Sequence, residues 1–349
     1  MFKKTKLKGA IPDHIISVLE TIENNGFKAF VVGGAIRDIL IGRVPIEYDL
    51  ASSATPNDIK KIFKNTSSIG EKFGTICIHQ QKKIIEITTF RRESNYANSR
   101  HPETVQFSNS IEEDLLRRDF TINAMAYHPS TDTLIDPFNG VNDLNHRLLN
   151  CVGNAAERLS EDSLRAFRCF RFMSQLGFVV SKDVIHALQH LSDIPLPSVP
   201  RIRSEMDRLI LGRFWLSTLT LMKSTQWLPR IIPETPSIES IQIPEEHLYR
   251  WAWLLSKADL TNVGLKLQFS KSDIRHMNLI NKWSYDEYAI NLTVNDIEIS
   301  TNTLIDLGYT NKALGSIQKD LLHLIRQKKL KNNTESIQKY LKNKAKNSE

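Results

Sequence analysis

The hydrophobic pattern of this chain changes near residue 150. Before that point, helical stretches at 15–24, 35–42 and 55–63 alternate with strand-like stretches at 27–32 and 47–51. The runs TICIHQ (75–80) and KIIEITTF (83–90) are rich in β-branched residues and are joined by a short polar turn, which is typical of a hairpin. Beyond Gly153 nearly every stretch has helical period. The pattern therefore predicts an α+β fold, in which a small mixed sheet with helices is followed by helices alone.

We expect the change of pattern to mark domain boundaries. The predicted boundary separates a mixed α/β segment at 1–150 from an all-helical remainder at 151–349. The final segment, from Arg326 onward, holds eight Lys or Arg against two Glu, which is more typical of a solvated surface than of a binding arm.

Composition narrows the class of protein. No run of eighteen apolar residues exists and the start of the chain has no apolar segment of signal-peptide length, so we predict a cytoplasmic protein with no membrane partner. The net charge of +7 suits a polyanionic partner, although many basic proteins bind no nucleic acid. Cys77, Cys151 and Cys169 lack metal-ligand spacing and are expected in the core. Nothing in the composition indicates the oligomeric state.

A carboxylate pair follows a glycine turn. Side chains at i and i+2 of a strand face the same way, so Glu47 and Asp49 are expected side by side. Such a pair is tolerable around Mg²⁺, which prefers carboxylate, phosphate and water oxygens. Glu86, on a neighbouring predicted strand, is a candidate third carboxylate. Taken alone, the carboxylate pair could be the solvent-facing side of a strand, and the two glycines could be an ordinary turn. Together they favour a phosphate and metal site, because Gly33 and Gly34 bring backbone N–H groups to the start of a helix, which favours phosphate.

The stretch VVGGAIRDILIGRVPIEYDLASSATP resembles the signature of the class II tRNA nucleotidyltransferase and bacterial poly(A) polymerase superfamily, whose head is a polymerase-β-type nucleotidyltransferase domain. Further blocks resemble the family's motifs in the same order: EITTFR (86–91), EEDLLRRDFTINAMA (112–126), EDSLRAFRCFRF (161–172), and the closing LIDLGYTNKALGSIQKDLLHLI and NNTESIQKYL. The resemblance implies a catalytic head at 1–150, a helical neck at 151–225 that selects the nucleotide base, and a helical body and tail at 226–349 that bind tRNA.

The resemblance also assigns roles to single residues. It implies that Glu47, Asp49 and Glu86 are catalytic, with Glu47 and Asp49 as the metal ligands, and that the incoming nucleotide is bound by Gly33, Gly34, Arg37, Arg118, Asp119, Asp162, Arg165, Arg168 and Arg171. Asp162 and Arg165 would read the base, because a carboxylate accepts from the amino group that C and A share and Arg donates to a ring acceptor. Without the resemblance, Arg168 and Arg171 are better interpreted as a basic stripe on a helix.

Two features bear on the activity. The family has Asp at both metal positions, whereas the first is Glu47 here; its extra methylene predicts lower activity or a shift from Mg²⁺ toward Mn²⁺. The polar segment 91–105 resembles the flexible loop of full CCA-adding enzymes, with Arg100 as its basic residue.

The segment SSIGEKFGTICI (67–78) resembles the CCA-adding form more than poly(A) polymerase. We therefore predict template-independent addition of C, C and A to the 3′ end of tRNA from CTP and ATP, with the acceptor arm of tRNA as partner. The alternatives are an enzyme that adds A alone, a poly(A) polymerase, and an RNA-binding paralogue with weakened catalysis.

Overall fold

The computed structural model describes residues 6–68, 70–80, 83–97, 101–239, 241, 243–283, 286–310 and 312–346. The chain divides into two compact units, Met1–Ile231 and Ile232–Glu349. No helix in the described ranges has both the length and the apolar character that crossing a membrane requires. The first unit contains the predicted head and neck together, so the boundary at residue 150 stays a prediction.

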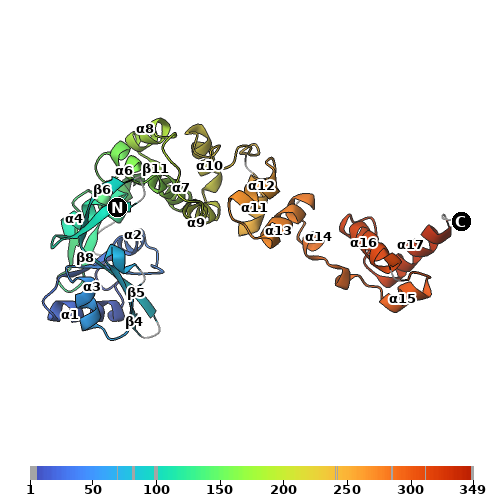
Figure 1. Ribbon diagram of the computed structural model, residues 1–349, viewed down its shortest axis with the longest axis horizontal. Helices are drawn as coiled ribbons and strands as arrows, with labels where there is room; N and C mark the ends of the chain where they lie inside the picture. The colour runs from blue at the N-terminus through green and yellow to red at the C-terminus, as the bar shows by residue number, and fades with distance from the viewer. Residues whose placement is uncertain are drawn as a thin grey trace. The chain divides into compact units, whose positions relative to one another are not determined.

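A mixed sheet lies in the N-terminal part of the first unit, and the helices after residue 150 lie outside it (Figure 1). Its strand order is β3-β4-β5-β2-β1-β8-β9, and β2 and β5 are parallel while the other neighbours are antiparallel. The strands are β1 (Ala29–Val32), β2 (Asp49–Ser52), β3 (Thr66–Ser67), β4 (Thr75–Gln80), β5 (Lys83–Thr89), β8 (Ala126–His128) and β9 (Thr133–Ile135). The predicted hairpin is confirmed, because β4 and β5 pair from Thr75↔Thr88 to Gln80↔Lys83.

Three helices and a short 3₁₀ turn accompany the first strands of the sheet. Helix α1 (Asp13–Asn24) contacts both β1 and α3 (Pro56–Ile62), while α2 (Gly34–Leu40) contacts β1 and the 3₁₀ turn η3 (Thr121–Asn123). Helix α3 begins where predicted, since Thr55 accepts a hydrogen bond from the Asp58 N–H and Pro56 occupies the first turn. One cluster of the head core comprises Phe30, Val32, Ala51, Phe90, Ile111, Leu115 and Ala126.

The segment that resembles the family's flexible loop forms a β-hairpin. Strand β6 (Arg91–Ala97) pairs with β7 (His101–Phe107), from Arg91↔Phe107 to Ala97↔His101. The backbone groups of both arms satisfy one another, and the resemblance of 91–105 to the family's flexible loop stays a prediction. Arg100 lies outside the described residues. The hairpin is followed by α4 (Ile111–Leu116), which begins at the cap residue Ser110.

Helices dominate the chain after residue 150, as predicted (Figure 1). The first unit continues through α5 (Gly140–His146), α6 (Ala155–Glu161), α7 (Leu164–Leu176), α8 (Lys182–His190), α9 (Val199–Ile210) and α10 (Trp215–Ser224), with one small parallel pair, β10 (Leu148–Leu149) and β11 (Val179–Val180). Helix α7 packs against both α9 and α10. All three cysteines are buried and free, which confirms their predicted place in the core.

The second unit is helical. Its elements are α11 (His247–Leu254), α12 (Leu260–Lys266), α13 (Lys271–Lys282), α14 (Glu287–Asn291), η4 (Val294–Asp296), α15 (Thr301–Asp306), α16 (Lys312–Arg326) and α17 (Thr334–Lys346). A core near the end of the chain joins Leu292, Ile297, Leu304, Ile317, Leu321, Ile325, Ile337 and Leu341. The apolar side chains at Ile337 and Leu341 thus bury one face of α17 and leave its lysines on the other.

Candidate functional site

A polar cleft of about 480 Å³ opens in the first unit. Eight arginines and four carboxylates line it, together with five other residues: Arg37, Arg117, Arg118, Arg165, Arg168, Arg171, Arg201 and Arg208; Glu47, Asp49, Asp119 and Asp162; Gly33, Gly34, Asn123, Leu164 and Phe172. The excess of guanidinium groups favours a ligand with several negative charges, and planar guanidinium groups match phosphate oxygens well. Of the predicted site residues that the structure describes, Glu86 is the one that does not line this cleft.

The glycine turn brings backbone and guanidinium together. Gly33 follows β1 with φ 73° and ψ −129°, a backbone conformation that residues other than glycine rarely adopt. A Cβ atom at Gly33 would lie 2.8 Å from Nη1 of Arg118. Glycine at this position therefore allows Arg118 to lie directly against the start of α2.

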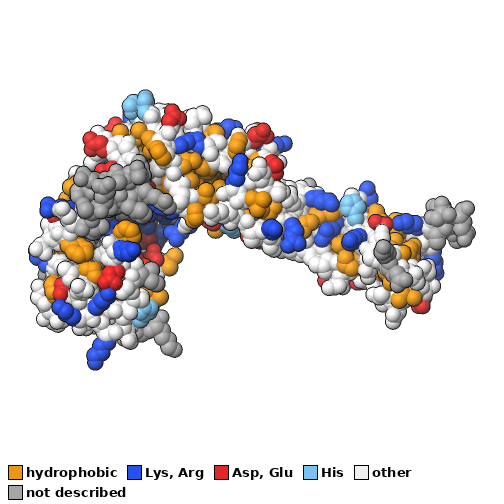
Figure 2. Space-filling model, viewed as in Figure 1, with side chains coloured by type: hydrophobic (Ala, Val, Ile, Leu, Met, Phe, Trp, Pro, Cys, Tyr) orange, Lys and Arg blue, Asp and Glu red, His pale blue; other side chains and the backbone are white. Residues whose placement is uncertain are grey.

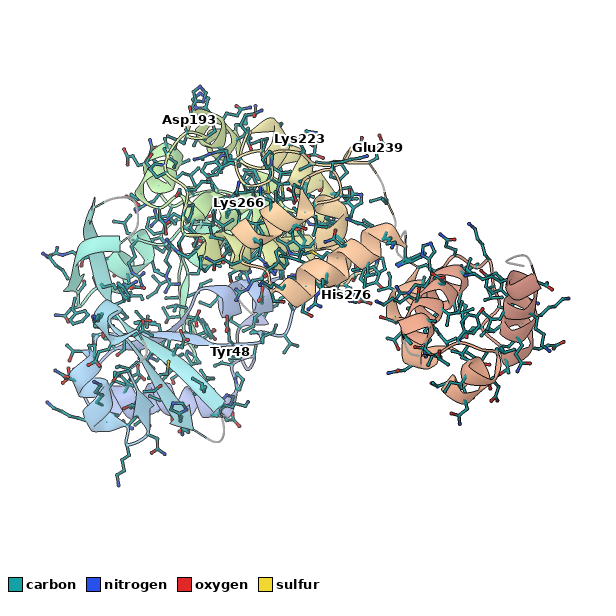
Figure 3. All side chains as sticks on the ribbon, turned by 45° about the vertical axis from the view of Figure 1, so that its right-hand side comes forward. Tyr48, Asp193, Lys223, Glu239, Lys266 and His276 are labelled. Carbon is teal, nitrogen blue, oxygen red and sulfur yellow. The ribbon has the colours of Figure 1, made fainter. Side chains whose placement is uncertain are left out.

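The two carboxylates reach the cleft from a loop and a strand end. Val32↔Asp49 is the last residue pair between β1 and β2, since the chain turns away at Gly33. Glu47 therefore has no strand partner, and the prediction that it lies on β2 was wrong. Tyr48, labelled in Figure 3, separates the two acids and is half-buried, whereas Glu47 is exposed.

The carboxylates affect one another electrostatically. Although Asp49 keeps contact with solvent, the surrounding protein atoms reduce its hydration and raise its pKa. The Glu47 charge and, more weakly, the Glu86 charge raise this pKa further, while Arg118 and Arg168 oppose the rise. Carboxylates that repel one another in this way suit a hard divalent cation, so the donor set fits Mg²⁺ or Mn²⁺.

The third carboxylate lies close to this pair without joining the cleft lining. The parallel register Leu50↔Ile87 places Glu86 of β5 beside the start of β2, where Asp49 lies. Within the described ranges, no group of three or more His, Cys, Asp or Glu side chains is arranged to hold a metal ion. The role of Glu86 as a third catalytic carboxylate therefore stays a prediction.

Arg37 and Arg118, which line the cleft beside the glycine turn, are held by protein partners. Arg37 donates to Oδ1 of Asn123 at 2.7 Å and pairs with Asp38 at 2.9 Å. Arg118 pairs with the buried Asp114 at 3.2 Å, and its buried Nε has no hydrogen-bond partner among the described residues. These anchors fix the guanidinium groups and leave donors for a ligand.

Asp119 contributes a structural ion pair to the cleft wall. Its carboxylate accepts from Arg168 at 2.5 Å and from the N–H of Phe120 at 2.8 Å. Burial alone would raise the pKa of Asp119, but the charge and hydrogen bonds of Arg168, with the Phe120 N–H, lower it to about 2. The acid is therefore ionised throughout the neutral range and keeps Arg168 in place.

The two residues expected to read the base meet at the junction of α6 and α7. Asp162 accepts from the N–H of Leu164 at 3.0 Å and from Nη2 of Arg201 at 2.7 Å. Arg165 is mostly buried and donates to Glu161 and to the carbonyl oxygens of Arg158 and Arg117. Both side chains line the cleft in orientations that the protein fixes; their contact with a base stays a prediction.

Sequence reasoning missed several cleft residues, namely Arg117, Asn123, Leu164, Phe172, Arg201 and Arg208. Arg201 and Arg208 lie on α9 at i and i+7, on the same face as Glu205, which forms a buried ion pair with Arg171 at 2.5 Å. This helical spacing was visible in the sequence and could have identified both arginines. Phe172 was harder to find, because its role depends on the guanidinium groups of Arg37, Arg168 and Arg171, which lie 4.0–5.5 Å from its ring centre.

A known family model identifies the class of protein to which the first unit belongs. Residues 29–150 match the model of the poly A polymerase head domain, which covers the sheet, the glycine turn and both carboxylates. A head of this type with an arginine-lined cleft defines a nucleotidyltransferase.

Curated relatives then assign the family. The chain is 35% identical over 294 residues to the CCA-adding enzyme of Geobacillus kaustophilus, covering 82% of this chain and 71% of the relative. It is 37% identical over 286 residues to that of Geobacillus stearothermophilus, covering 81% and 70%. The chain therefore belongs to the family of CCA-adding enzymes, as the sequence motifs indicated.

Solved structures share the fold. The CCA-adding enzyme of Bacillus stearothermophilus, determined in complex with CTP, aligns over 96% of this chain and 98% of its own with a TM-score of 0.74 and 23% identity. The Thermotoga maritima CCA-adding enzyme, complexed with tRNA, aligns over 96% and 97% with a TM-score of 0.67 and 16% identity. The predicted α+β head followed by helices is thereby confirmed.

Proposed function

We propose that this protein adds C, C and A to the 3′ end of tRNA, using CTP and ATP and no nucleic-acid template. The observation that carries the proposal is the cleft in which Glu47 and Asp49 face eight arginines. Membership of the CCA-adding family supplies the substrates, since relatives with this name were solved with CTP, with ATP and with tRNA. Enzymes that add CCA act on tRNA inside the cell, and we propose the cytoplasm as the site of this reaction.

The reaction joins an RNA hydroxyl to a nucleotide. The 3′-hydroxyl oxygen attacks the α-phosphorus of CTP or ATP, a new O–P bond forms, and the bond to pyrophosphate breaks. Glu47 and Asp49 would hold Mg²⁺, which when bound eases deprotonation of the hydroxyl and neutralises charge on the phosphates. Arg37, Arg118 and Arg168 bind the triphosphate, with Gly33 and Gly34 allowing its close approach and Asp119 holding Arg168.

Base selection belongs to Asp162 and Arg165. An ionised carboxylate only accepts hydrogen bonds and a guanidinium only donates them, so the pair complements C and A, which present an amino group beside a ring acceptor. The same pair leaves the carbonyl groups of U and G unmatched, and an unmatched buried polar group is unfavourable. Arg171, tied to Glu205, supports α7 behind the selecting residues.

Glu47 in place of Asp shifts one metal ligand by a methylene. Mg²⁺ requires nearly ideal octahedral geometry, so we expect a lower rate with Mg²⁺ than with Mn²⁺. The position of Glu47 in an exposed loop rather than in a strand allows its backbone to adjust to the longer side chain.

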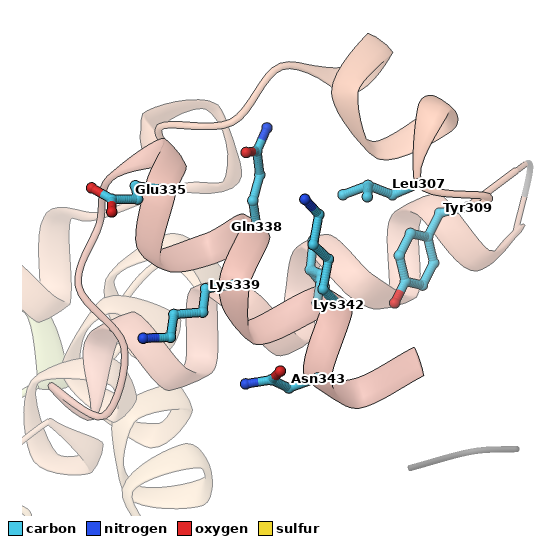
Figure 4. Close-up of a pocket in the computed structure, with 8 residues that line it drawn as sticks. Leu307, Tyr309, Glu335, Gln338, Lys339, Lys342 and Asn343 are labelled. Carbon is cyan, nitrogen blue, oxygen red and sulfur yellow. The ribbon is translucent and has the colours of Figure 1, made fainter. Parts of the chain in front are cut away.

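The second unit supplies a surface for tRNA. A hollow of about 540 Å³ lies between α17 and the turn after α15, and Figure 4 shows Lys339 and Lys342 beside Gln338, Asn343 and Tyr309. Figure 2 shows further Lys and Arg side chains over the helices of this unit. Amides, an aromatic ring and lysines suit contact with RNA backbone and ribose, which is how structured RNA is bound without reading its sequence.

The test is incorporation into tRNA lacking its terminal CCA, followed by sequencing of the added 3′ tail. We expect CCA with CTP and ATP, no incorporation by Asp49→Asn, and unchanged activity of Asp183→Asn, a matched control on the exposed face of α8. A tail of A alone, or of many A residues, would assign one of the alternative enzymes. No incorporation with either Mg²⁺ or Mn²⁺ would favour the non-catalytic RNA-binding paralogue.

A further inference from the structure

Two histidines lie one turn apart on helix α8 (Figure 1). Among the ten histidines of the sequence, His186 and His190 are the one pair separated by three or four positions. Residues at i and i+4 lie on the same face of a helix, and both of these side chains are exposed. Figure 2 shows histidine side chains in pale blue on the outer surface of this helix. The pair is therefore open to solvent and to dissolved ions.

The two imidazole rings of the pair face one another. Their centres are 3.9 Å apart, and their planes are 27° from parallel. Two nitrogen ligands in adjacent positions on one metal ion lie about 3 Å apart, because each metal–nitrogen bond is about 2 Å long. A small rotation of the rings about their side-chain bonds therefore brings one nitrogen of each ring to a shared ion.

A hydrogen bond to the backbone selects the nitrogen of His190 that can bind a metal. Nδ1 of His190 lies 2.8 Å from the carbonyl oxygen of His186. A carbonyl oxygen only accepts hydrogen bonds, so Nδ1 carries the proton and Nε2 of the neutral ring keeps its lone pair. Metal-binding histidines are commonly held in this way, with the second ring nitrogen donating to a carbonyl or a carboxylate. The hydrogen bond thus favours the tautomer that a metal site requires.

The fold anchors the helix that carries the pair. Val184, Ala187 and Leu188 are buried on one face of α8, and Ser181 caps the helix by accepting from the Val184 N–H. The indole Nε1 of the buried Trp227 donates to the carbonyl oxygen of Leu188 at 2.8 Å. The spacing of the two histidines is therefore set before a metal binds, which reduces the entropy lost on binding.

We propose that His186 and His190 form a second cation site, for Cu²⁺, Ni²⁺ or Zn²⁺, separate from the carboxylate pair in the cleft. Imidazole nitrogen suits these metals, whereas carboxylate oxygen suits Mg²⁺ and Mn²⁺, so the two sites take different ions. Within the described ranges, no third His, Cys, Asp or Glu side chain completes the group, so water fills the other positions on the metal. The affinity is expected to be highest for Cu²⁺.

The first test is isothermal titration calorimetry with Cu²⁺ on the full-length protein, without an affinity tag and in saturating Mg²⁺. We expect one tight site per chain in the wild type and about 100-fold weaker binding in His190→Gln, because the second ligand no longer reinforces the first. His146→Gln is the matched control and should bind as the wild type does. His146 is exposed on α5, and its Nδ1 lies 2.9 Å from the carbonyl oxygen of Asn142, but no histidine lies four positions away.

The affinities decide between a built site and chance binding. Equal affinities of the wild type and His190→Gln would overturn the inference and indicate an adventitious ion only. Asp49→Asn, which lacks a carboxylate of the cleft, should keep the tight site. Loss of Cu²⁺ binding in Asp49→Asn would instead place the ion at the carboxylate pair and would also overturn the inference.

A second test identifies the ligands and does not depend on turnover. Pulsed electron paramagnetic resonance of bound Cu²⁺ counts the imidazole rings that coordinate the ion. We expect two rings in the wild type and in His146→Gln, and one in His190→Gln. A single ring in the wild type, or none, would refute the pairing. Absence of CCA addition by the wild-type protein would count against the proposed function alone, because neither readout for Cu²⁺ requires catalysis.

Discussion

Replacing Gly33 by alanine should damage nucleotide binding more than it damages the fold. The new methyl group would lie 2.8 Å from Nη1 of Arg118, far inside normal contact distance. Arg118 is a flexible side chain, so it can move aside, but the move takes its guanidinium away from the cleft. The backbone conformation at this position, with φ 73° and ψ −129°, is also unfavourable for alanine, although glycine tolerates it.

The two effects have separable magnitudes. Holding alanine in this backbone conformation costs about 1–3 kcal/mol of unfolding free energy. Misplacing one charged hydrogen-bond donor weakens nucleotide binding by about 1.5–3 kcal/mol, which corresponds to a rise in KM for CTP of roughly 10–100-fold. Gly153→Ala provides the control, because Gly153 has φ 72° and no atom within 4 Å of the added methyl. It should lose stability by about 1–2 kcal/mol and keep its KM.

The assay combines urea unfolding with steady-state kinetics on CTP. A double-mutant cycle strengthens it: in an Arg118→Ala background, Gly33→Ala should no longer raise KM, because the methyl group meets no guanidinium. Equal effects of Gly33→Ala and Gly153→Ala on KM, or a Gly33→Ala enzyme with normal KM for CTP, would refute the reasoning.

Two further predictions concern buried ion pairs. Glu205→Ala should lower the free energy of unfolding by about 3–5 kcal/mol, because it leaves the buried Arg171 guanidinium without its partner; urea denaturation measures this, and a loss below about 1 kcal/mol would contradict it. The pKa of Asp119 is about 2 in the folded protein, below its ordinary value near 4. Its ion pair with Arg168 therefore stabilises the fold above pH 4 by an amount on the order of 2 kcal/mol. This stabilisation is lost as the pH falls toward 2. Unfolding free energies measured between pH 2 and 5 should therefore fall less steeply toward acid in Asp119→Asn than in the wild type, and equal slopes would exclude the effect.

Local signals predicted the fold well. The cap at Thr55 and the following Pro56 fixed the start of α3, and the β-branched residues identified the hairpin of β4 and β5. Each of these features depends on residues that are neighbours in the sequence. Most of the cleft residues were likewise identified by the family motifs, because each motif is a short continuous stretch of the chain.

Features that depend on distant partners could not be predicted. The start of β2 depends on where β1 ends, and β1 ends because Gly33 turns the chain, so nothing around Glu47 itself showed that it lies outside the sheet. The hairpin of β6 and β7 was missed because backbone pairing leaves no apolar alternation in a polar segment. Helical spacing could have identified Arg201 as a member of a basic face, but its contact with Asp162, 39 positions away in the sequence, could not be predicted.

The contacts of Asp162 orient its side chain before any ligand binds. Each carboxylate oxygen has two lone pairs, so the hydrogen bonds from Arg201 and from the Leu164 N–H leave acceptor capacity for a third donor. The entropy of fixing this side chain is lost once, during folding, and no incoming nucleotide has to order it again. In its proposed role, Asp162 would therefore offer each incoming base a carboxylate whose orientation is already set by Arg201 and the Leu164 N–H.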